Sequence, residues 1–129
     1  LFYRENLMQR TMLKSKLHQA RVTDVLIDYE GSIEIDEDLL DEVGIITYEQ
    51  VHIYNISNGH RFITYAIPGF RGSRAISING AAARLAHIND RIIIAAYGIM
   101  DEDLENIKPK VVVLDENNQI VEKKGSLVS

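Results

Sequence analysis

An alternating run of apolar and polar residues is the feature that most constrains how this chain can fold. Its odd positions are Val25, Ile27, Tyr29, Gly31, Ile33 and Ile35, and its even positions from Asp28 onward are Asp28, Glu30, Ser32 and Glu34. A period of two is that of a half-buried β-strand, so the run predicts a strand over 25–35. Glycine on the apolar side of a strand marks a bulge or a close backbone approach.

The Gly31–Ser32 pair within this run has a structural and a chemical interpretation. As a structural feature it is a kink, the common role of such dipeptides. As a chemical feature it is a self-cleavage site, in which the serine hydroxyl attacks the preceding carbonyl and converts the amide to an ester. β-Elimination then leaves dehydroalanine, which hydrolyses to a pyruvoyl ketone at position 32 with loss of ammonia. Glycine suits the acyl side because it has no β-carbon to crowd the attack, and donors to the developing oxyanion are also required.

The composition is that of one globular domain and excludes several kinds of site. The chain has 129 residues, of which 46% are hydrophobic and 26% charged, enough for one core. Its formal net charge of -5 argues against non-specific nucleic-acid binding. The absence of cysteine excludes disulfides, thiolate zinc sites and cysteine nucleophiles. No apolar run approaches the roughly 20 residues of a membrane span, so we expect a cytoplasmic protein.

The segment pattern predicts a mainly β chain. Strands are expected over 10–23, 25–35, 49–56, 61–67, 75–79, 91–97, 110–114 and 120–121, with a loop over 68–73, short helices over 36–44, 80–86 and 101–107, and a frayed tail from 123. Asp36 is a natural N-cap and Gly44 a terminator for the first helix. Asn58-Gly59 favours a hairpin turn, because both residues tolerate positive φ. Short strands with short helices between them favour a small β-barrel.

The strand over 61–67 carries residues suited to binding and proton transfer. Arg61 and Tyr65 share one face of an ideal strand, whereas Thr64 points the other way. Arg61 can bind a substrate carboxylate and Tyr65 can donate a proton. Thr64 needs a bulge, or a neighbouring subunit, to reach the same site. The alternative is a surface strand with ordinary polar residues.

Two other segments have a similar pair of interpretations. The small residues Asn79 to Ala83, at a strand-to-helix junction, either leave backbone N–H groups open to an anion or simply allow close packing. Lys16 and His18 lie on one strand face, as a cation and a proton carrier or as a solvated surface. The other histidines, which are scattered and lack paired acidic residues, predict no metal site: His52, His60 and His87.

Taken together, these segments resemble the pyruvoyl-dependent aspartate 1-decarboxylases, bacterial enzymes that make β-alanine for pantothenate. The resemblance runs from about Met8 to Val113 in the family's order and spacing, with no departure at a catalytic position. The matching stretches are Arg10-Thr11-Met12, Lys16-Leu17-His18, Tyr29-Glu30-Gly31-Ser32, Ile35-Asp36, Asn58-Gly59, Arg61-Phe62, Thr64-Tyr65-Ala66-Ile67, Arg71-Gly72-Ser73-Arg74 and Asn79-Gly80-Ala81-Ala82-Ala83.

The resemblance implies a fold, an assembly and a cofactor. The fold is a small double-psi β-barrel with short helices, and four copies form a homotetramer with active sites between subunits. One decarboxylase domain covers 8–129, after a leading 1–7 that we expect to be an expression remnant or a disordered extension. Self-cleavage divides the chain into 1–31 (β chain) and 32–129 (α chain). The cofactor is a covalent pyruvoyl group with no metal and no pyridoxal phosphate, and the substrate is L-aspartate.

Residue roles follow from the same resemblance. Ser32 becomes the pyruvoyl group, Gly31 ends the N-terminal fragment, and Thr64 assists cleavage and lines the substrate site. Tyr65 protonates the former α-carbon after carbon dioxide leaves. The resemblance also implies that Arg61 and Lys16 bind the substrate carboxylates. It implies backbone contacts to the substrate from Gly80, Ala81 and Ala82, and supporting roles for His18, Tyr29 and Asn79.

Two alternatives to a self-sufficient decarboxylase stay open at this point. The first is a non-catalytic β-barrel interaction module, whose Gly31–Ser32 is only a bulge and which tolerates Ser32→Ala fully. The second is a family member that remains an uncleaved proenzyme until a maturation factor assists it. We expect neither a nucleic acid nor a membrane as a partner of this protein.

Overall fold

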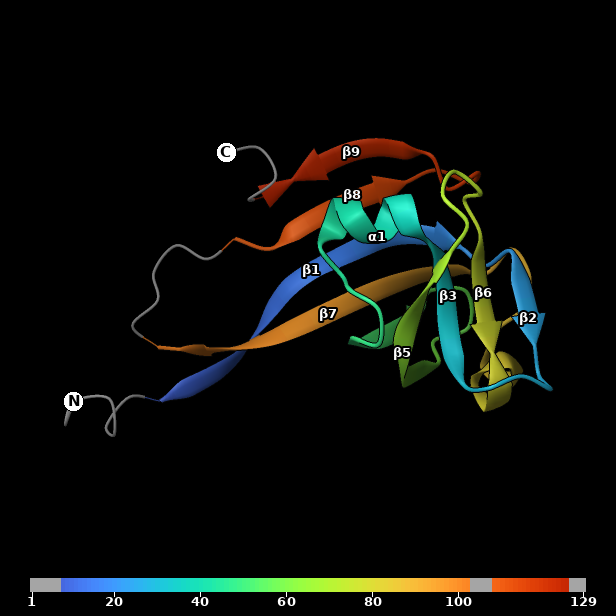
Figure 1. Cartoon of the computed structure of the whole chain (residues 1–129), viewed down its shortest axis with the longest axis horizontal. Coiled ribbons are helices and arrows are strands. Elements are labelled where there is room, and N and C mark those ends of the chain that lie inside the picture. The colour runs from blue at the N-terminus through green and yellow to red at the C-terminus, as the bar shows by residue number, and fades with distance from the viewer. Residues whose placement is uncertain (1–7, 103–107, 126–129) are drawn as a thin grey trace.

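The computed structural model describes residues 8–102 and 108–125. Its elements are β1 (Gln9–Arg21), β2 (Asp24–Leu26), β3 (Ser32–Asp36), α1 (Glu37–Val43), β4 (Gln50–Asn55), β5 (Arg61–Gly69), β6 (Ile76–Asn79), the 3₁₀ helix η2 (Gly80–Leu85), β7 (Arg91–Asp101), β8 (Lys110–Leu114) and β9 (Ile120–Lys124). The described part of the chain is therefore mainly β with short helices, as predicted (Figure 1). The predicted leading segment 1–7 and most of the predicted helix over 101–107 lie outside the described residues.

The strands are hydrogen-bonded in the order β2-β6-β3-β5-β4-β7-β1-β8-β9. Three of the pairs are parallel, namely β1 with β8, β2 with β6, and β3 with β5. The long β1 and β7 run side by side, while β3, β6 and β2 stand at one end of the molecule (Figure 1). The strand order thus places β1 and β6 far apart along the sheet.

Asn118 joins two segments that are far apart in the strand order. It lies in the turn between β8 and β9, is 1% exposed, and has a φ of 58°. Its Oδ1 accepts from the Arg21 backbone N–H at 2.7 Å, and its Nδ2 donates to the carbonyls of Arg21 (3.0 Å) and Arg74 (2.9 Å). One buried amide therefore connects the end of β1 to the loop before β6.

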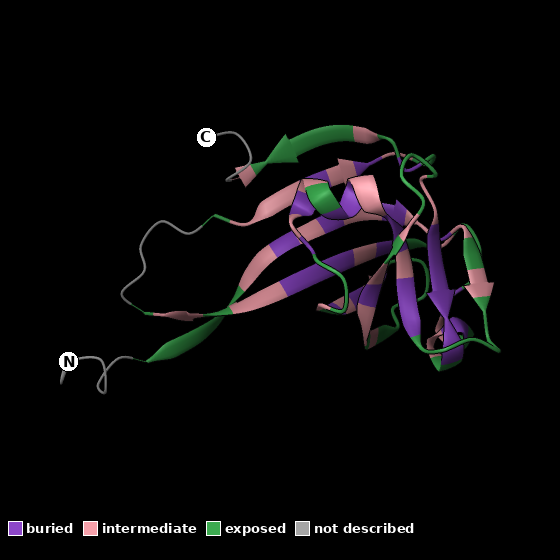
Figure 2. Cartoon of the chain, in the orientation of Figure 1, coloured by how far each residue is buried: buried purple, intermediate pink, exposed green. Residues whose placement is uncertain are grey.

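Helix α1 covers the core in the way its sequence predicts. Asp36 caps it by accepting from the Asp38 backbone N–H, and Gly44 ends it with a φ of 67°. Its buried side chains are Leu39, Leu40 and Val43. They join the buried aliphatic residues of β1, β3, β4, β6 and β7, and Figure 2 shows the buried segments gathered where these strands meet below the helix. This apolar burial is the main stabilising contribution to the fold.

The predicted continuous strand over 25–35 is wrong. β2 ends at Leu26, residues 27–31 turn the chain, and β3 begins at Ser32. Both strands pair with β6, and Asn79 is the partner of Leu26 on one side and of Ser32 on the other. The alternation continued through the turn only because apolar side chains there face solvent, with Tyr29 55% exposed.

Three smaller expectations also need correction. Pro68 and Gly69 complete β5 rather than opening the loop, because they pair with Ile35 and Asp36 of β3. The predicted frayed tail from residue 123 is wrong for 123–124, which pair with β8 inside β9. The helix predicted over 80–86 is a 3₁₀ helix that ends at Leu85. The remaining strands and the two predicted hairpins are confirmed within a few residues.

Candidate active site

The hydroxyl of Ser32 lies in a buried chain of polar groups. Ser32 is 1% exposed, and Asn79, its partner across the β3–β6 pair, is 0% exposed. Asn79 Nδ2 donates to Ser32 Oγ at 3.1 Å, and Ser32 Oγ donates to the Glu30 carbonyl at 3.2 Å. Ser77 Oγ in turn donates to Asn79 Oδ1 at 2.8 Å, which orients the amide. The hydroxyl is therefore held in one place by neighbours that are themselves fixed.

Gly80 packs directly against the residues before Ser32. Its φ is 80°, and a Cβ at this position would lie 2.6 Å from the Gly31 Cα, 2.8 Å from the Gly31 N and 3.0 Å from the Tyr29 carbonyl oxygen. Only glycine fits such an approach. The strand-to-helix junction is therefore closely packed at Gly80.

Gly31 differs sharply from Ser32 in its surroundings. Gly31 is exposed, and a Cβ added to it would meet no atom within 4 Å, whereas Ser32 is buried. The peptide bond between them therefore joins an exposed residue to a buried one. The predicted bulge inside a strand is replaced by a bend that delivers the chain into β3.

Tyr65 lies beside this bend in the strand register. Ile33 pairs with Ala66 in the parallel β3–β5 ladder, and both side chains are fully buried. One residue earlier, Ser32 and Tyr65 therefore adjoin each other on the opposite face of the sheet. The Tyr65 ring lies 6.1 Å from that of Tyr48. A phenol able to donate a proton thus stands on the strand next to the serine.

The side chain of Thr64 lies on the opposite face of β5 from that of Tyr65, as the alternation of side chains along a strand predicts. The β4–β5 register runs without a shift, so the bulge that could have turned Thr64 is absent from this ladder. Thr64 pairs with Val51, which is fully buried. Within one chain, Thr64 therefore does not share the face of Tyr65.

Lys16 and His18 lie on one face of β1, as predicted, on either side of the fully buried Leu17. Lys16 pairs with Ala95 of β7 on one side and Val111 of β8 on the other. His18 Nδ1 is buried with no hydrogen-bond partner among the described residues. Burial, and then the positive charges of Lys16 and Lys124, hold the pKa of His18 below its ordinary value.

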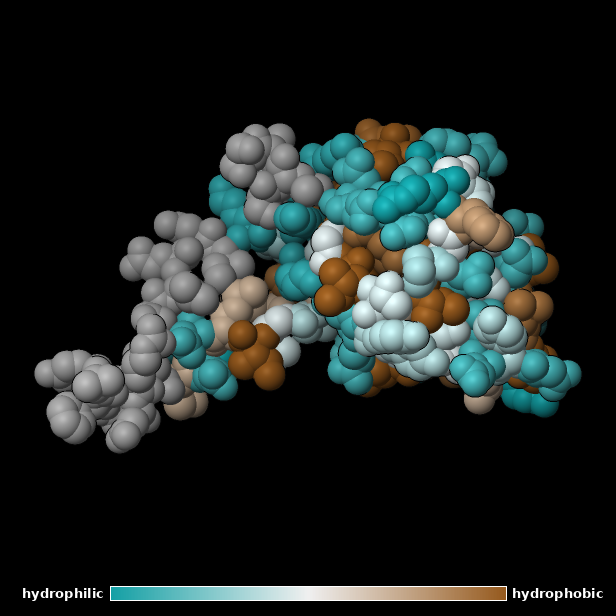
Figure 3. All heavy atoms as spheres, viewed as in Figure 1, coloured by the Kyte–Doolittle hydropathy of each residue, from teal (hydrophilic) through white to brown (hydrophobic). Residues whose placement is uncertain are grey.

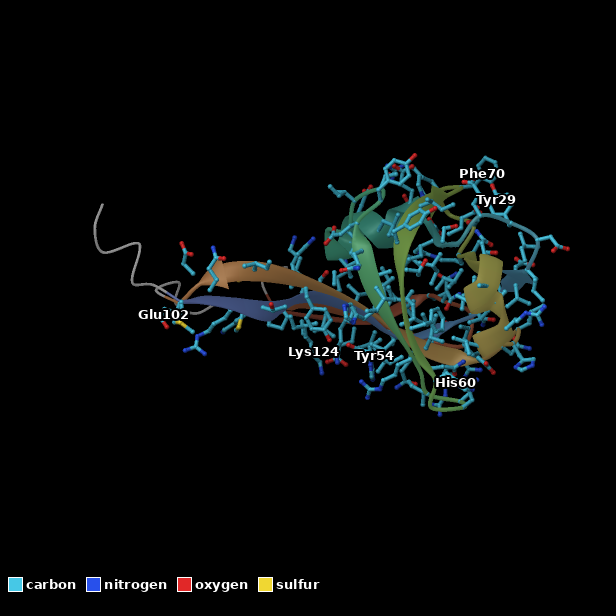
Figure 4. All side chains as sticks on the ribbon, turned by 90° about the horizontal axis from the view of Figure 1, so that it is seen from below. Tyr29, Tyr54, His60, Phe70, Glu102 and Lys124 are labelled. Atoms are coloured by element: carbon cyan, nitrogen blue, oxygen red, sulfur yellow. The ribbon has the colours of Figure 1, made fainter. Side chains whose placement is uncertain are left out.

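The two cations predicted to bind substrate do not meet Ser32 within one chain. Arg61 precedes Tyr65 by four residues, or about 13 Å along β5. Lys16 belongs to β1, which is separated from β3 by β5, β4 and β7 in the strand order. Figure 4 shows Tyr29, close to the bend, well apart from Tyr54, the strand partner of Arg61. Within the described chain, Ser32 therefore lies apart from Arg61 and Lys16, the two cations predicted to belong to the same site.

Three aromatic side chains near Arg61 were not predicted as site residues. They are His52 and Tyr54 on β4 and Tyr97 on β7. Alternation along β4 places His52 and Tyr54 on one face and was available from the sequence. Their meeting with Tyr97 was not, because it depends on β7 being the neighbour of β4. Ser77 was missed for the same reason, since its role appears only through Asn79.

Two kinds of feature are absent from the described ranges. Residues 8–102 and 108–125 contain no group of three or more histidine, cysteine or acidic side chains that could hold a metal ion. They also contain no helix long and apolar enough to cross a membrane.

Comparison with known proteins gives the family. The aspartate decarboxylase family model matches residues 8–121, which include every predicted site residue. The chain belongs to the aspartate decarboxylase family. It is 62% identical over 115 residues to the aspartate 1-decarboxylase of Tolumonas auensis, covering 88% of this chain and 91% of that protein. It is 55% identical over 121 residues to the aspartate 1-decarboxylase of Halorhodospira halophila, covering 93% and 96%.

Membership confirms the resemblance and the enzyme class predicted from the sequence, and it supports the predicted double-psi β-barrel. Among solved structures, the rationally designed protein mkDPBB_sym_86 matches 65% of this chain and 91% of its own, at 12% identity and a TM-score of 0.42.

Proposed function

We propose that this chain converts L-aspartate to β-alanine and carbon dioxide in the cytoplasm, for pantothenate and coenzyme A synthesis. The observation that carries the proposal is the Gly31–Ser32 peptide, where an exposed glycine precedes a buried serine whose hydroxyl is held by Asn79. This arrangement occurs in a chain of the aspartate decarboxylase family. Relatives named aspartate 1-decarboxylase share more than half of its residues over most of its length.

The first step proposed is self-cleavage. Ser32 Oγ adds to the Gly31 carbonyl carbon, the C–N bond breaks, and the amide becomes an ester with a free amine on residue 32. Loss of the Cα proton of residue 32 and breakage of its Cβ–Oγ bond release Gly31 as a carboxylate and leave dehydroalanine. Water then replaces the nitrogen, which departs as ammonia, and a ketone remains. Thr64 of a neighbouring copy assists, because strand parity keeps this chain's own Thr64 on the other face.

The surrounding residues suit a pyruvoyl group at position 32. That position is buried, is held across β6 by Asn79, and is packed from behind by Gly80, so the ketone would be kept in place and shielded from bulk water. The group supplies an electron sink for the loss of the α-carboxylate. Tyr65, adjoining position 32 in the register, donates a proton to the former α-carbon, a contribution of about 10²–10⁴-fold in rate.

The proposal includes a homotetramer in which neighbouring copies complete each active site. Arg61 and Lys16 bind the substrate carboxylates, and both lie away from Ser32 in their own chain, so a second copy must supply them. Backbone contacts from Gly80, Ala81 and Ala82, and support from His18 and Tyr29, complete the site. Large apolar side chains left exposed by the single chain support assembly, namely Ile46 (71%), Tyr48 (74%) and Ile63 (56%). Figure 3 shows apolar patches on the face it displays.

Intact-protein mass spectrometry tests the proposal. The purified chain is expected to give two fragments ending and beginning at Gly31–Ser32, and borohydride with aspartate should add mass only to the larger one. Ser32→Ala should give one uncleaved chain with no release of carbon dioxide from aspartate. The exposed loop variant Ser73→Ala should cleave normally. A single uncleaved and inactive wild-type chain, after prolonged warming, would count against self-cleavage, and rescue by a cell extract would favour the proenzyme that needs a maturation factor.

A further inference from the structure

The guanidinium of Arg61 rests against an aromatic ring. Its Cζ lies 4.5 Å from the centroid of the Tyr54 ring, within the range of a cation–π contact. Tyr54 is also the strand partner of Arg61 across the β4–β5 hairpin, so the backbone register imposes the contact. No carboxylate from the described residues pairs with Arg61, in contrast to Arg71, which contacts Glu37, Asp38 and Asp41. The N–H groups of Arg61 therefore remain available to a ligand.

The Tyr54 ring is itself fixed by Tyr97. Their hydroxyl oxygens lie 2.6 Å apart in a hydrogen bond between β4 and β7. The Tyr97 ring meets the His52 ring edge-on, with centroids 4.9 Å apart and an interplanar angle of 73°. The Tyr54 ring is held through its hydroxyl by Tyr97, whose own ring packs against His52, so the Tyr54 ring has little freedom to rotate. The contact with Arg61 is thus made to a rigid surface.

The strand registers place this cluster on the same face as Lys16. His52 pairs with Ile63 on β5 and with Ala95 on β7, and Ala95 pairs with Lys16 on β1. His52 and Tyr54 lie on this same face, and Val51 and Ile53, which alternate with them along β4, are fully buried on the other. The aromatic cluster therefore lies between the two cations assigned to the substrate carboxylates.

We propose that Tyr54 and Tyr97 are positioning residues that hold Arg61 in its carboxylate-binding conformation and so set the selectivity for a dicarboxylate. The inference rests on the proposed function, which makes Arg61 a substrate ligand. A free arginine side chain loses rotamer entropy when it is ordered. A guanidinium that already lies on a ring loses less on binding, and its N–H edge stays free for a bidentate carboxylate. Tyr54 supplies the ring, and Tyr97 fixes that ring through the shared hydrogen bond.

Binding of succinate, a dicarboxylate without an amine to react, gives a test that does not require turnover. Calorimetry on the assembled protein should show at least tenfold weaker succinate binding for Tyr54→Leu, which removes the ring. Tyr54→Phe and Tyr97→Phe keep both rings but break the hydrogen bond, so each should weaken binding by about threefold. The double variant should bind succinate no more weakly than either single variant, because both changes break the same hydrogen bond. The exposed ring variant Phe70→Leu should bind as the wild type does.

Steady-state kinetics separate positioning from a merely structural role. The positioning variants should raise KM for aspartate while kcat stays within about twofold, and should lower the preference for aspartate over asparagine, its neutral isostere. Unchanged succinate affinity, or a fall in kcat with KM and preference unaltered, would overturn the inference. If Tyr54→Leu does not assemble, the two phenylalanine variants decide the question. A wild type that binds succinate but neither cleaves nor turns over aspartate would refute the proposed function alone.

Discussion

Asn79 Nδ2 donates to Ser32 Oγ at 3.1 Å across the first pair of the β3–β6 ladder, and both side chains are buried. The contact joins the residue that would be consumed in self-cleavage to the last residue before η2. It depends on β6 lying between β2 and β3, with the bend over 27–31 reversing the chain around the end of β6. The reactive hydroxyl is thus located by backbone pairing first and by a side-chain hydrogen bond second.

Removal of the Asn79 amide should slow self-cleavage. Asn79→Ala leaves Ser32 Oγ without its donor and Ser77 Oγ without its acceptor. One such hydrogen bond contributes about 1–2 kcal/mol, so we expect cleavage to be slower by about tenfold. The rate is measured from the fraction of intact chain over time by mass spectrometry. Asn117→Ala, on the exposed turn before β9, serves as a control, and cleavage at the same rate in both variants would show that the amide is dispensable.

A methyl group at position 80 should block cleavage, whereas the same change at Gly59 should not. Both glycines have positive φ, 80° and 82°, so alanine introduces similar backbone strain, about 1–2 kcal/mol, at each. Only at position 80 would the new Cβ also meet Gly31, at 2.6 Å from its Cα; at position 59 it meets nothing within 4 Å. Thermal unfolding and cleavage are measured together. Equal losses in the two variants would mean that strain alone, and not contact with Gly31, matters at Gly80.

The free energy of unfolding should fall as the solution is acidified below about pH 6.5, because of His18. The pKa of His18 is lowered in the folded chain from 6.5, first by burial and then by Lys16 and Lys124. Below 6.5 the unfolded chain therefore binds a proton more readily than the folded chain does, so stability is lost as pH decreases through the folded pKa. Guanidinium unfolding between about pH 7.5 and about pH 5.5 measures the effect.

The matched variants for that experiment are His18→Gln and His87→Gln. The first should make stability less dependent on pH across this window, because the group that titrates differently is gone. The second removes a histidine whose side chain is 84% exposed, and its pH profile should match the wild type. Parallel profiles for His18→Gln and the wild type would exclude His18 as the origin of the acid sensitivity.

Loss of the Asn118 amide should destabilise the fold without touching the site. Asn118→Ala removes three hydrogen bonds to Arg21 and Arg74 and leaves part-buried backbone groups unpaired, at up to about 1–3 kcal/mol for each unsatisfied group. Asn118→Asp keeps the acceptor but not the two donated bonds, so it too should lower the guanidinium midpoint. Asn117→Ala should change stability by less than about 0.5 kcal/mol. A midpoint unaltered in Asn118→Ala would mean that these three hydrogen bonds do not stabilise the fold.

Structural features that depend on residues close together along the chain were predicted correctly from the sequence. Features that depend on contacts between distant segments were predicted less well. Helix α1 was predicted at both ends, because its cap and terminator lie within a few residues of it along the chain. The hairpin at Asn58-Gly59 was predicted for the same reason. The strand over 25–35 was wrong because its alternation continued through a turn whose apolar side chains are exposed. An alternating pattern shows which residues are apolar and which are polar. It does not show whether the apolar side chains are buried in the folded chain.

The sequence by itself determined the family, the mainly β class and the identity of the candidate reactive residues, because these depend on residue types and on their order and spacing along the chain. Only the tertiary structure decided that Ser32 is held by Asn79, that Gly80 contacts Gly31, and that Tyr54 is hydrogen-bonded to Tyr97. Each of these contacts depends on which strands are neighbours. Strand order is set by the packing of the whole core, and no local pattern in the chain encodes it.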